Sequence, residues 1–124
     1  MRIKQVFIRP NTELSKRIAE WTEGYGIVCT EITLDEDFEE NIDGLVIFNQ
    51  DQELDKEISD IRNLFDGRQK PVIHVDFDGT LMVGVSNFSL WVERNSCKNI
   101  LVVGNESLIQ NPNLERFLGQ LKVD

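Results

Sequence analysis

The chain has 124 residues, of which 40% are hydrophobic and 28% are charged, and its net charge at pH 7 is −9. This length corresponds to about one domain, so we expect a single domain over residues 1–124. The acidic balance argues against binding to nucleic acid or to an anionic membrane surface, because both need clustered lysine and arginine. The apolar runs are far shorter than a membrane-spanning helix, and the N-terminus lacks the apolar region of a signal peptide. Two cysteines do not make a disulfide scaffold, so we expect a cytoplasmic protein.

Five short runs rich in β-branched residues predict the strands, and they lie at residues 3–8, 27–33, 44–48, 71–76 and 99–103. Runs that are apolar along their whole length are typical of strands buried on both faces of a parallel sheet. We expect the third and fourth strands to be central. The residues that should then be almost fully buried are Val46, Ile47, Val72, Ile73 and Val75.

Helical patterns separate most of these strands. Thr12 predicts the N-cap of a helix that runs to about residue 21 or 23, and the glycines at 24 and 26 end it. Further helices are predicted at residues 52–65, 86–95 and 112–122, with an irregular stretch at 79–85 and an acidic loop or one short helix at 34–43. Alternation of strands and helices with right-handed crossovers predicts an α/β fold, a flavodoxin-like doubly wound parallel five-stranded sheet of order 2-1-3-4-5.

Polar residues follow the strands at the edge where sites form in such sheets, the carboxyl ends of the strands. The candidate binding residues at this edge are Arg9, Asn11, Asn49, Asp51, Asp76, Asp78, Gly104 and Asn105. Arg9 is the cation there. It would meet a phosphate or a carboxylate of a ligand, or it would neutralise part of the acidic rim.

The sharpest local motif is VIHVDFDGTL at residues 72–81, which resembles the first motif of haloacid-dehalogenase-type phosphatases. The resemblance implies that Asp76 attacks phosphorus and that Asp78 acts as general acid and base beside magnesium. The alternative is a strand that ends in a turn, with the Asp and Gly residues there for backbone reasons. We favour the turn, because no second acidic pair follows residue 81, and we expect Asp76 to accept backbone N–H groups.

A second resemblance covers residues 3–76. The segments IDGLVIFNQ at 42–50 and QKPVIHV at 69–75, with an acidic helix between them, are similar to the centre of TIR domains and of nucleoside 2-deoxyribosyltransferases. The resemblance implies a nucleotide or nucleoside ligand at the strand ends and cleavage or exchange of an N-glycosidic bond. A glutamate of the central helix would stabilise the sugar cation, and Glu57 and Glu53 are the candidates. The ordinary alternative for both acids is a solvated helix face.

Several alternatives stay open. His74 is expected to be a hydrogen-bonded core residue rather than a base. The acidic run at 35–40 is expected to be a solvated loop, or else a weak cation site together with Asp76 and Asp78. The sequence indicates no particular cofactor and does not decide whether the chain is an enzyme. The competing function is a non-catalytic module that docks a protein partner or self-associates.

Overall fold

The computed structural model describes residues 2–33, 37–50 and 54–123. Its five strands form one parallel sheet, and they are β1 (Gln5–Ile8), β2 (Val28–Glu31), β3 (Gly44–Asn49), β4 (Val72–Asp76) and β5 (Asn99–Gly104). The helices are α1 (Glu13–Gly24), α2 (Lys56–Gly67), α3 (Leu81–Arg94) and α4 (Pro112–Gln120), with the 3-10 helices η1 (Phe38–Asn41) and η2 (Glu106–Gln110). The predicted flavodoxin-like, doubly wound α/β fold is confirmed. None of the helices in the described ranges is long and apolar enough to cross a membrane.

The predicted strand order is wrong. The sheet has the order β2-β1-β5-β3-β4, so β5 lies between β1 and β3, and β4 is at the edge. The handedness rule fixes the face on which a connection runs, but it does not fix how many strands the connection crosses. The sequence holds a weak signal for the true order, because β5 is apolar after its first residue, Asn99, whereas β4 contains His74 in its middle.

Because β4 lies at the edge, the burial of its residues differs from the prediction. Val46 and Ile47 of β3 are fully buried and Val75 is 3% exposed, as expected. Val72 and Ile73 are only half-buried, because one side of an edge strand has no neighbouring strand to cover it. The prediction for His74 is wrong for the same reason, since its side chain is exposed.

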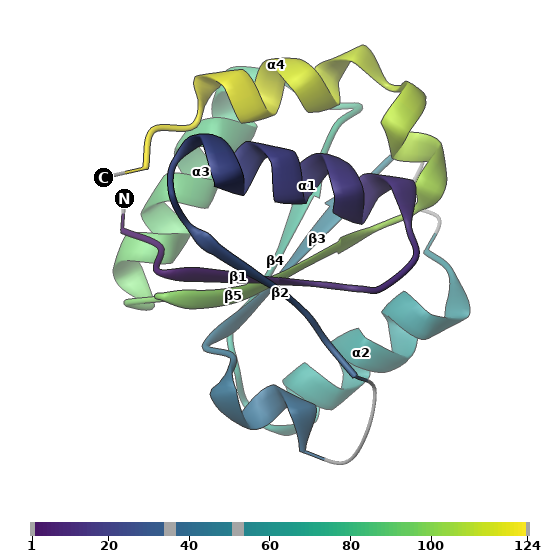
Figure 1. The fold of residues 1–124 in the computed structure, drawn as a ribbon, viewed down its shortest axis with the longest axis vertical. Coiled ribbons are helices and arrows are strands. Elements are labelled where there is room, and N and C mark those ends of the chain that lie inside the picture. The colour runs from purple at the N-terminus through teal and green to yellow at the C-terminus, as the bar shows by residue number, and fades with distance from the viewer. Residues whose placement is uncertain (1, 34–36, 51–53, 124) are drawn as a thin grey trace.

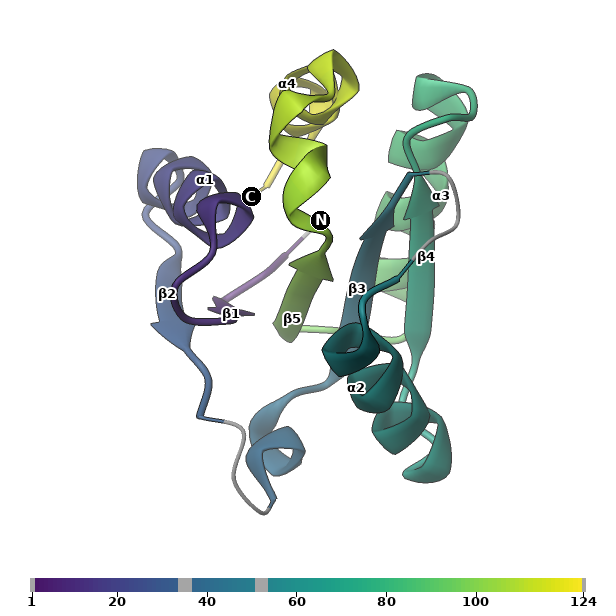
Figure 2. The same cartoon turned by 90° about the vertical axis from the view of Figure 1, so that its right-hand side faces the viewer.

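The helices form layers on both faces of the sheet. α1, α3 and α4 cover one face, and α2 covers the other (Figure 1 and Figure 2). η1 belongs to the α2 layer, where Phe38 packs against a second buried cluster built on β3, β5 and α2. In the larger cluster Phe48, Phe77 and Phe117 meet edge to face, with ring centroids 5.2–5.5 Å apart.

Local sequence signals explain most element ends. Thr12 accepts the Ser15 N–H at 3.0 Å as the predicted N-cap of α1, and Gly26 beyond its end has φ +67°. Two expectations were wrong. The first is the helix predicted at 52–65, because α2 begins at Lys56. Residues 51–53 lie outside the described part of the chain. The second is the irregular stretch at 79–85, because α3 already begins at Leu81, where packing against the core overrides a glycine within the helix.

Candidate functional site

The carboxyl ends of β3 and β5 form a topological switch point. The chain leaves β3 towards α2 on one face of the sheet and leaves β5 towards η2 and α4 on the other. Because adjacent strands send their connections in opposite directions here, the strand ends separate and leave room for a ligand. Asn49, Gly104 and Asn105 lie at or directly after these two strand ends.

Arg9 connects three elements at this edge. Its residue is only 6% exposed, although it follows β1 directly. One guanidinium nitrogen, Nη2, donates to the Gly104 carbonyl at 2.9 Å. The other, Nη1, donates to Glu57 Oε1 at 3.1 Å and to Asp55 Oδ2 at 3.3 Å. The structure therefore brings Arg9 and Gly104 together with the candidate catalytic residue Glu57.

Asp55 was not among the sequence candidates, although it holds the site together. Its Oδ1 accepts the Ile58 N–H at 2.8 Å and so caps α2, while its Oδ2 pairs with Arg9. Its own N–H donates to Asn105 Oδ1 at 3.1 Å, which ties the start of α2 to the end of β5. An aspartate just before an amphipathic helix is an N-cap signal, so the capping role was readable, whereas the pairing with Arg9 was not.

Glu57 lines an open groove on the α2 side of the sheet. The groove has a volume of about 510 Å³ and is lined by Phe38, Lys56, Glu57, Asp60 and Ile61. The side chain of Glu57 is 48% exposed, so it can contact a molecule in the groove while Arg9 holds one of its oxygens. Half-buried Phe38 supplies an aromatic wall. The other catalytic candidate, Glu53, lies outside the described residues.

Asn49 presents an unused acceptor close to the switch point. Its residue is 8% exposed, and its Oδ1 is buried with no hydrogen-bond partner among the residues that the structure describes. Side chains alternate along β3, and Leu45 and Ile47 belong to the cluster under α2, so Asn49 also lies on the α2 face. A buried acceptor without a partner is costly, so a donor from a ligand would be favoured here. Asp51, the next candidate, lies outside the described residues.

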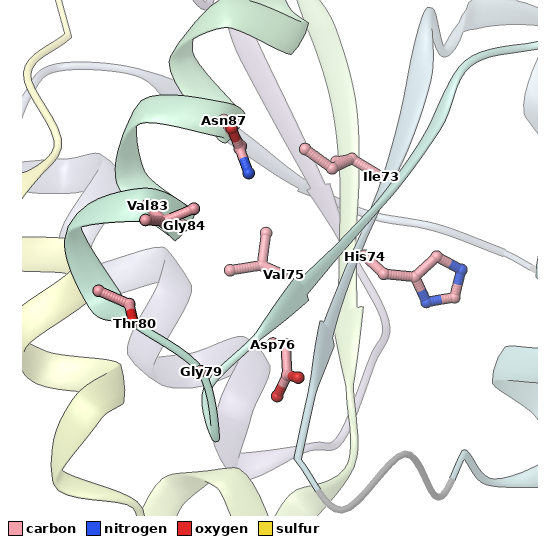
Figure 3. A pocket seen from close by; sticks show the side chains of 9 residues that line it. All are labelled: Ile73, His74, Val75, Asp76, Gly79, Thr80, Val83, Gly84 and Asn87. Carbon is pink, nitrogen blue, oxygen red and sulfur yellow. The ribbon is translucent and has the colours of Figure 1, made fainter.

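Asn11 and Asp76 lie in other surroundings, and among the described residues their side chains form no hydrogen bond with Arg9, Asp55 or Glu57. Asn11 is exposed in the turn before α1, with φ +62°. Asp76 Oδ1 accepts the Asp78 N–H at 2.8 Å, and the Asp76 carbonyl accepts the Gly79 N–H at 3.4 Å, which confirms the predicted turn. Figure 3 shows the Asp76 carboxylate beside this turn. Within the described ranges no group of three His, Cys, Asp or Glu side chains is placed to hold a metal ion.

Negative charge predominates around the cluster. Arg9 faces the two carboxylates of Asp55 and Glu57, so the three side chains together carry a formal charge of about −1. Nearby, Glu106 accepts the N–H groups of Glu13 at 2.9 Å and Leu14 at 3.3 Å, and so occupies the N-terminus of α1. The dipole of that helix is thereby matched by a protein carboxylate and is not open to a phosphate.

Comparison with known proteins supports the fold and leaves the family open. No protein-family model matches the chain, and no curated protein matches it in sequence. Among solved structures, it is similar to a protein from Syntrophus aciditrophicus SB described as a "Putative molybdenum carrier protein". The TM-score is 0.69 at 10% sequence identity, and the alignment covers 94% of this chain and 90% of that one. At this identity the similarity establishes the shared fold alone.

Proposed function

We propose that this chain binds a nucleoside, or the nucleoside part of a larger molecule, in the groove between η1 and α2. The observation that carries the proposal is the position of Glu57, which lines the groove beside Phe38 while Arg9 fixes one of its oxygens. A carboxylate and an aromatic ring on one groove match the two parts of a nucleoside. The carboxylate accepts hydrogen bonds from sugar hydroxyl groups, and the ring stacks on the base.

The charge of the site favours a neutral ligand over a free phosphate. The positive charge of Arg9 is already matched by two carboxylates, and Asp60 adds a further acid to the groove. A nucleotide would therefore have to direct its phosphates away from this cluster. The name of the Syntrophus protein suggests transport of molybdenum, but an anionic form such as molybdate would meet the same repulsion here.

The carboxylate of Glu57 could also assist cleavage of the N-glycosidic bond of a bound nucleoside. When an N-glycosidic bond breaks, positive charge develops on the sugar, and a fixed carboxylate beside it lowers the barrier. Arg9 and Asp55 act as positioning residues in this scheme, because they hold Glu57 and the first turn of α2 in place. Binding without cleavage is the simpler form, and measuring released base separates the two.

The test is calorimetric titration of the protein with a panel of nucleosides and with NAD, followed by chromatography for free base. We expect saturable binding of at least one nucleoside. Glu57→Gln should weaken it about tenfold or more, as expected for loss of a hydrogen bond to a charged group. Phe38→Leu, which keeps an apolar side chain beside Phe65, should also weaken binding through lost stacking on the base.

The matched control is Glu20→Gln on α1, because the side chain of Glu20 is 72% exposed and lies outside the groove. It should bind like the wild type. The thermal midpoints of Glu57→Gln and the control should remain close to that of the wild type, because neither change removes buried apolar surface and Arg9 keeps its bonds to Asp55 and Gly104 in Glu57→Gln. If no nucleoside binds, or if Glu57→Gln and Phe38→Leu bind as well as the control, the proposal is wrong.

A further inference from the structure

One wall of the groove, η1, is held by a lysine from a distant part of the chain. η1 supplies Phe38 to the groove and lies on the same face of the sheet as α2 (Figure 2). Lys70, in the connection between α2 and β4, donates from Nζ to the Glu39 carbonyl and, at 2.8 Å, to the Ile42 carbonyl. Carbonyl groups at the end of a helix lack partners within it, so Lys70 acts as a C-terminal cap of η1.

The buried acid of η1 adds little to this attachment. The Glu39 side chain is 3% exposed, and its Oε1 lies 3.4 Å from Nε of Arg68. Its other oxygen, Oε2, is buried and has no hydrogen-bond partner among the described residues. Burial of a carboxylate with incomplete partners costs free energy that one ion pair need not recover. The attachment of η1 to α2 therefore depends strongly on the bonds from Lys70 to its backbone.

The beginning of η1 is held less firmly than its end. Asp37, the residue before it, has φ +65° and forms no side-chain hydrogen bond to the helix in the described part of the chain. The half-buried ring of Phe38 meets Phe65 of α2, with ring centroids 6.4 Å apart. A 3-10 helix of four residues is too short to be stable by itself. Because Phe38 directly precedes Glu39, release of Lys70 would also displace the aromatic ring.

We infer that Lys70 is a positioning residue of the groove, which holds η1 against α2 and thereby keeps Phe38 in place for stacking. Lys70 is not among the described residues that line the groove, so it acts on a ligand only through η1. Without it, Phe38 occupies its place for a smaller fraction of the time, and the affinity falls by that fraction. The effect on nucleoside affinity rests on the proposed function, whereas the effect on η1 does not.

Amide hydrogen exchange measured by NMR tests the effect on η1. Lys70→Met keeps the apolar stem and removes the ammonium group. The amides of Glu40 and Ile42, which donate to Asp37 and Glu39, should exchange about tenfold faster or more, while amides of α2 keep their rates. Lys70→Arg keeps a charged donor and should restore most of the protection. Equal acceleration in η1 and α2 would reveal only a loss of global stability and would overturn the inference.

A double-mutant cycle tests the link to the ligand. Calorimetry with the nucleoside that binds best should show that Lys70→Met weakens binding by about fivefold or more, as expected for reduced stacking on the base. In the Phe38→Leu background, Lys70→Met should have little further effect, because both changes act through the side chain at position 38. An equal loss of affinity in both backgrounds would show that Lys70 acts by another route, and it would overturn the inference.

The matched control is Lys16→Met on α1, because Lys16 pairs with Glu13 at 3.1 Å on the exposed surface and lies outside the groove. It should match the wild type in exchange rates and in affinity. A wild type that binds no nucleoside would refute the proposed function, and the exchange rates would still decide the role of Lys70. Faster exchange confined to η1 in Lys70→Met would then support that role, and unchanged exchange would overturn it.

Discussion

At the scale of single residues, several polar and charged side chains are buried. At the carboxyl end of the sheet, Arg9 is buried with three acceptors, and Asn49 is buried with an acceptor that no described residue fills. Glu39 of η1 is 2% exposed, although its acidic neighbours in the sequence predict a solvated loop. Its Oε1 pairs with Arg68 at 3.4 Å, which offsets part of the cost of burial.

Cys97 makes the stability of the folded state depend on pH in the alkaline range. Burial and, to a smaller extent, the negative charge of Asp43 raise the pKa of its thiol from 9.0 to about 11. The folded state therefore keeps the proton when the unfolded state has lost it. The stability from this group is fully present below pH 9 and is lost as the pH rises towards 11.

Urea unfolding across this pH range measures the effect. The free energy of unfolding of the wild type should fall between pH 9 and pH 11 more steeply than that of Cys97→Ala, which has no thiol to ionise. Other groups titrate equally in both proteins and cancel in the comparison. Parallel curves for the two proteins would contradict the assignment.

The composition of the site was only partly predictable from the sequence. The rule that sites lie at strand ends selected Arg9, Asn49, Gly104 and Asn105, and the structure places them at that edge. The contacts that join Arg9 to Asp55 and to Gly104 connect residues 46 and 95 positions apart, so no local pattern reports them. The pairing of Asp55 with Arg9 was equally unpredictable, because the local sequence around Asp55 indicates only a helix cap.

At the scale of elements, β5 is held tightly against its neighbours because it ends in Gly104. A Cβ atom there would come within 2.7 Å of both Leu108 Cδ1 and Leu14 Cδ2, and within 2.9 Å of the Phe48 carbonyl oxygen. The Gly104 carbonyl also accepts from Arg9. Glycine at this point thus sets the spacing between β5, β3 and the helices above them.

Gly104→Ala should destabilise the protein by about 1–3 kcal/mol, because one of the atoms in contact is backbone and cannot move aside. The control is Gly119→Ala within α4, where a Cβ has nothing within 4 Å. That change should stabilise the helix by about 0.5–1 kcal/mol. Chemical unfolding of both variants gives the comparison, and equal effects of the two changes would contradict this account.

The positions of the helices and strands along the chain were easier to predict than their arrangement in space. Hydrophobic runs located all five strands, and capping signals located the starts of α1 and α4. The start of α3 was missed because glycines at 79 and 84 favour irregular structure locally, whereas Leu81 and Val85 pack against the core. Tertiary contacts of this kind are not contained in a local pattern.

At the scale of the whole molecule, local sequence patterns predicted the type of fold, whereas packing decided the order of the strands. A flavodoxin-like sheet was expected, and it is present with β5 at its centre rather than at its edge. Burial selects this order, because every residue of β5 except Asn99 is buried whereas β4 is mostly half-buried or exposed. A strand this apolar takes an interior position with a strand on either side, whereas β4 takes the edge.

The central place of β5 has a consequence for synthesis on the ribosome. β1 pairs with β2 and β3 pairs with β4, and in the described part of the chain β5 is the strand that joins these two pairs, through β1 and β3. A nascent chain that has reached residue 98 therefore lacks the strand that joins the two pairs. We expect residues 1–98 alone to be degraded quickly by a protease, and a peptide of residues 99–124 added in trans to restore resistance. A protease-resistant 1–98 fragment would show that the halves assemble without it. If the expectation holds, the nascent chain stays open to chaperones and proteases until this last strand has been translated.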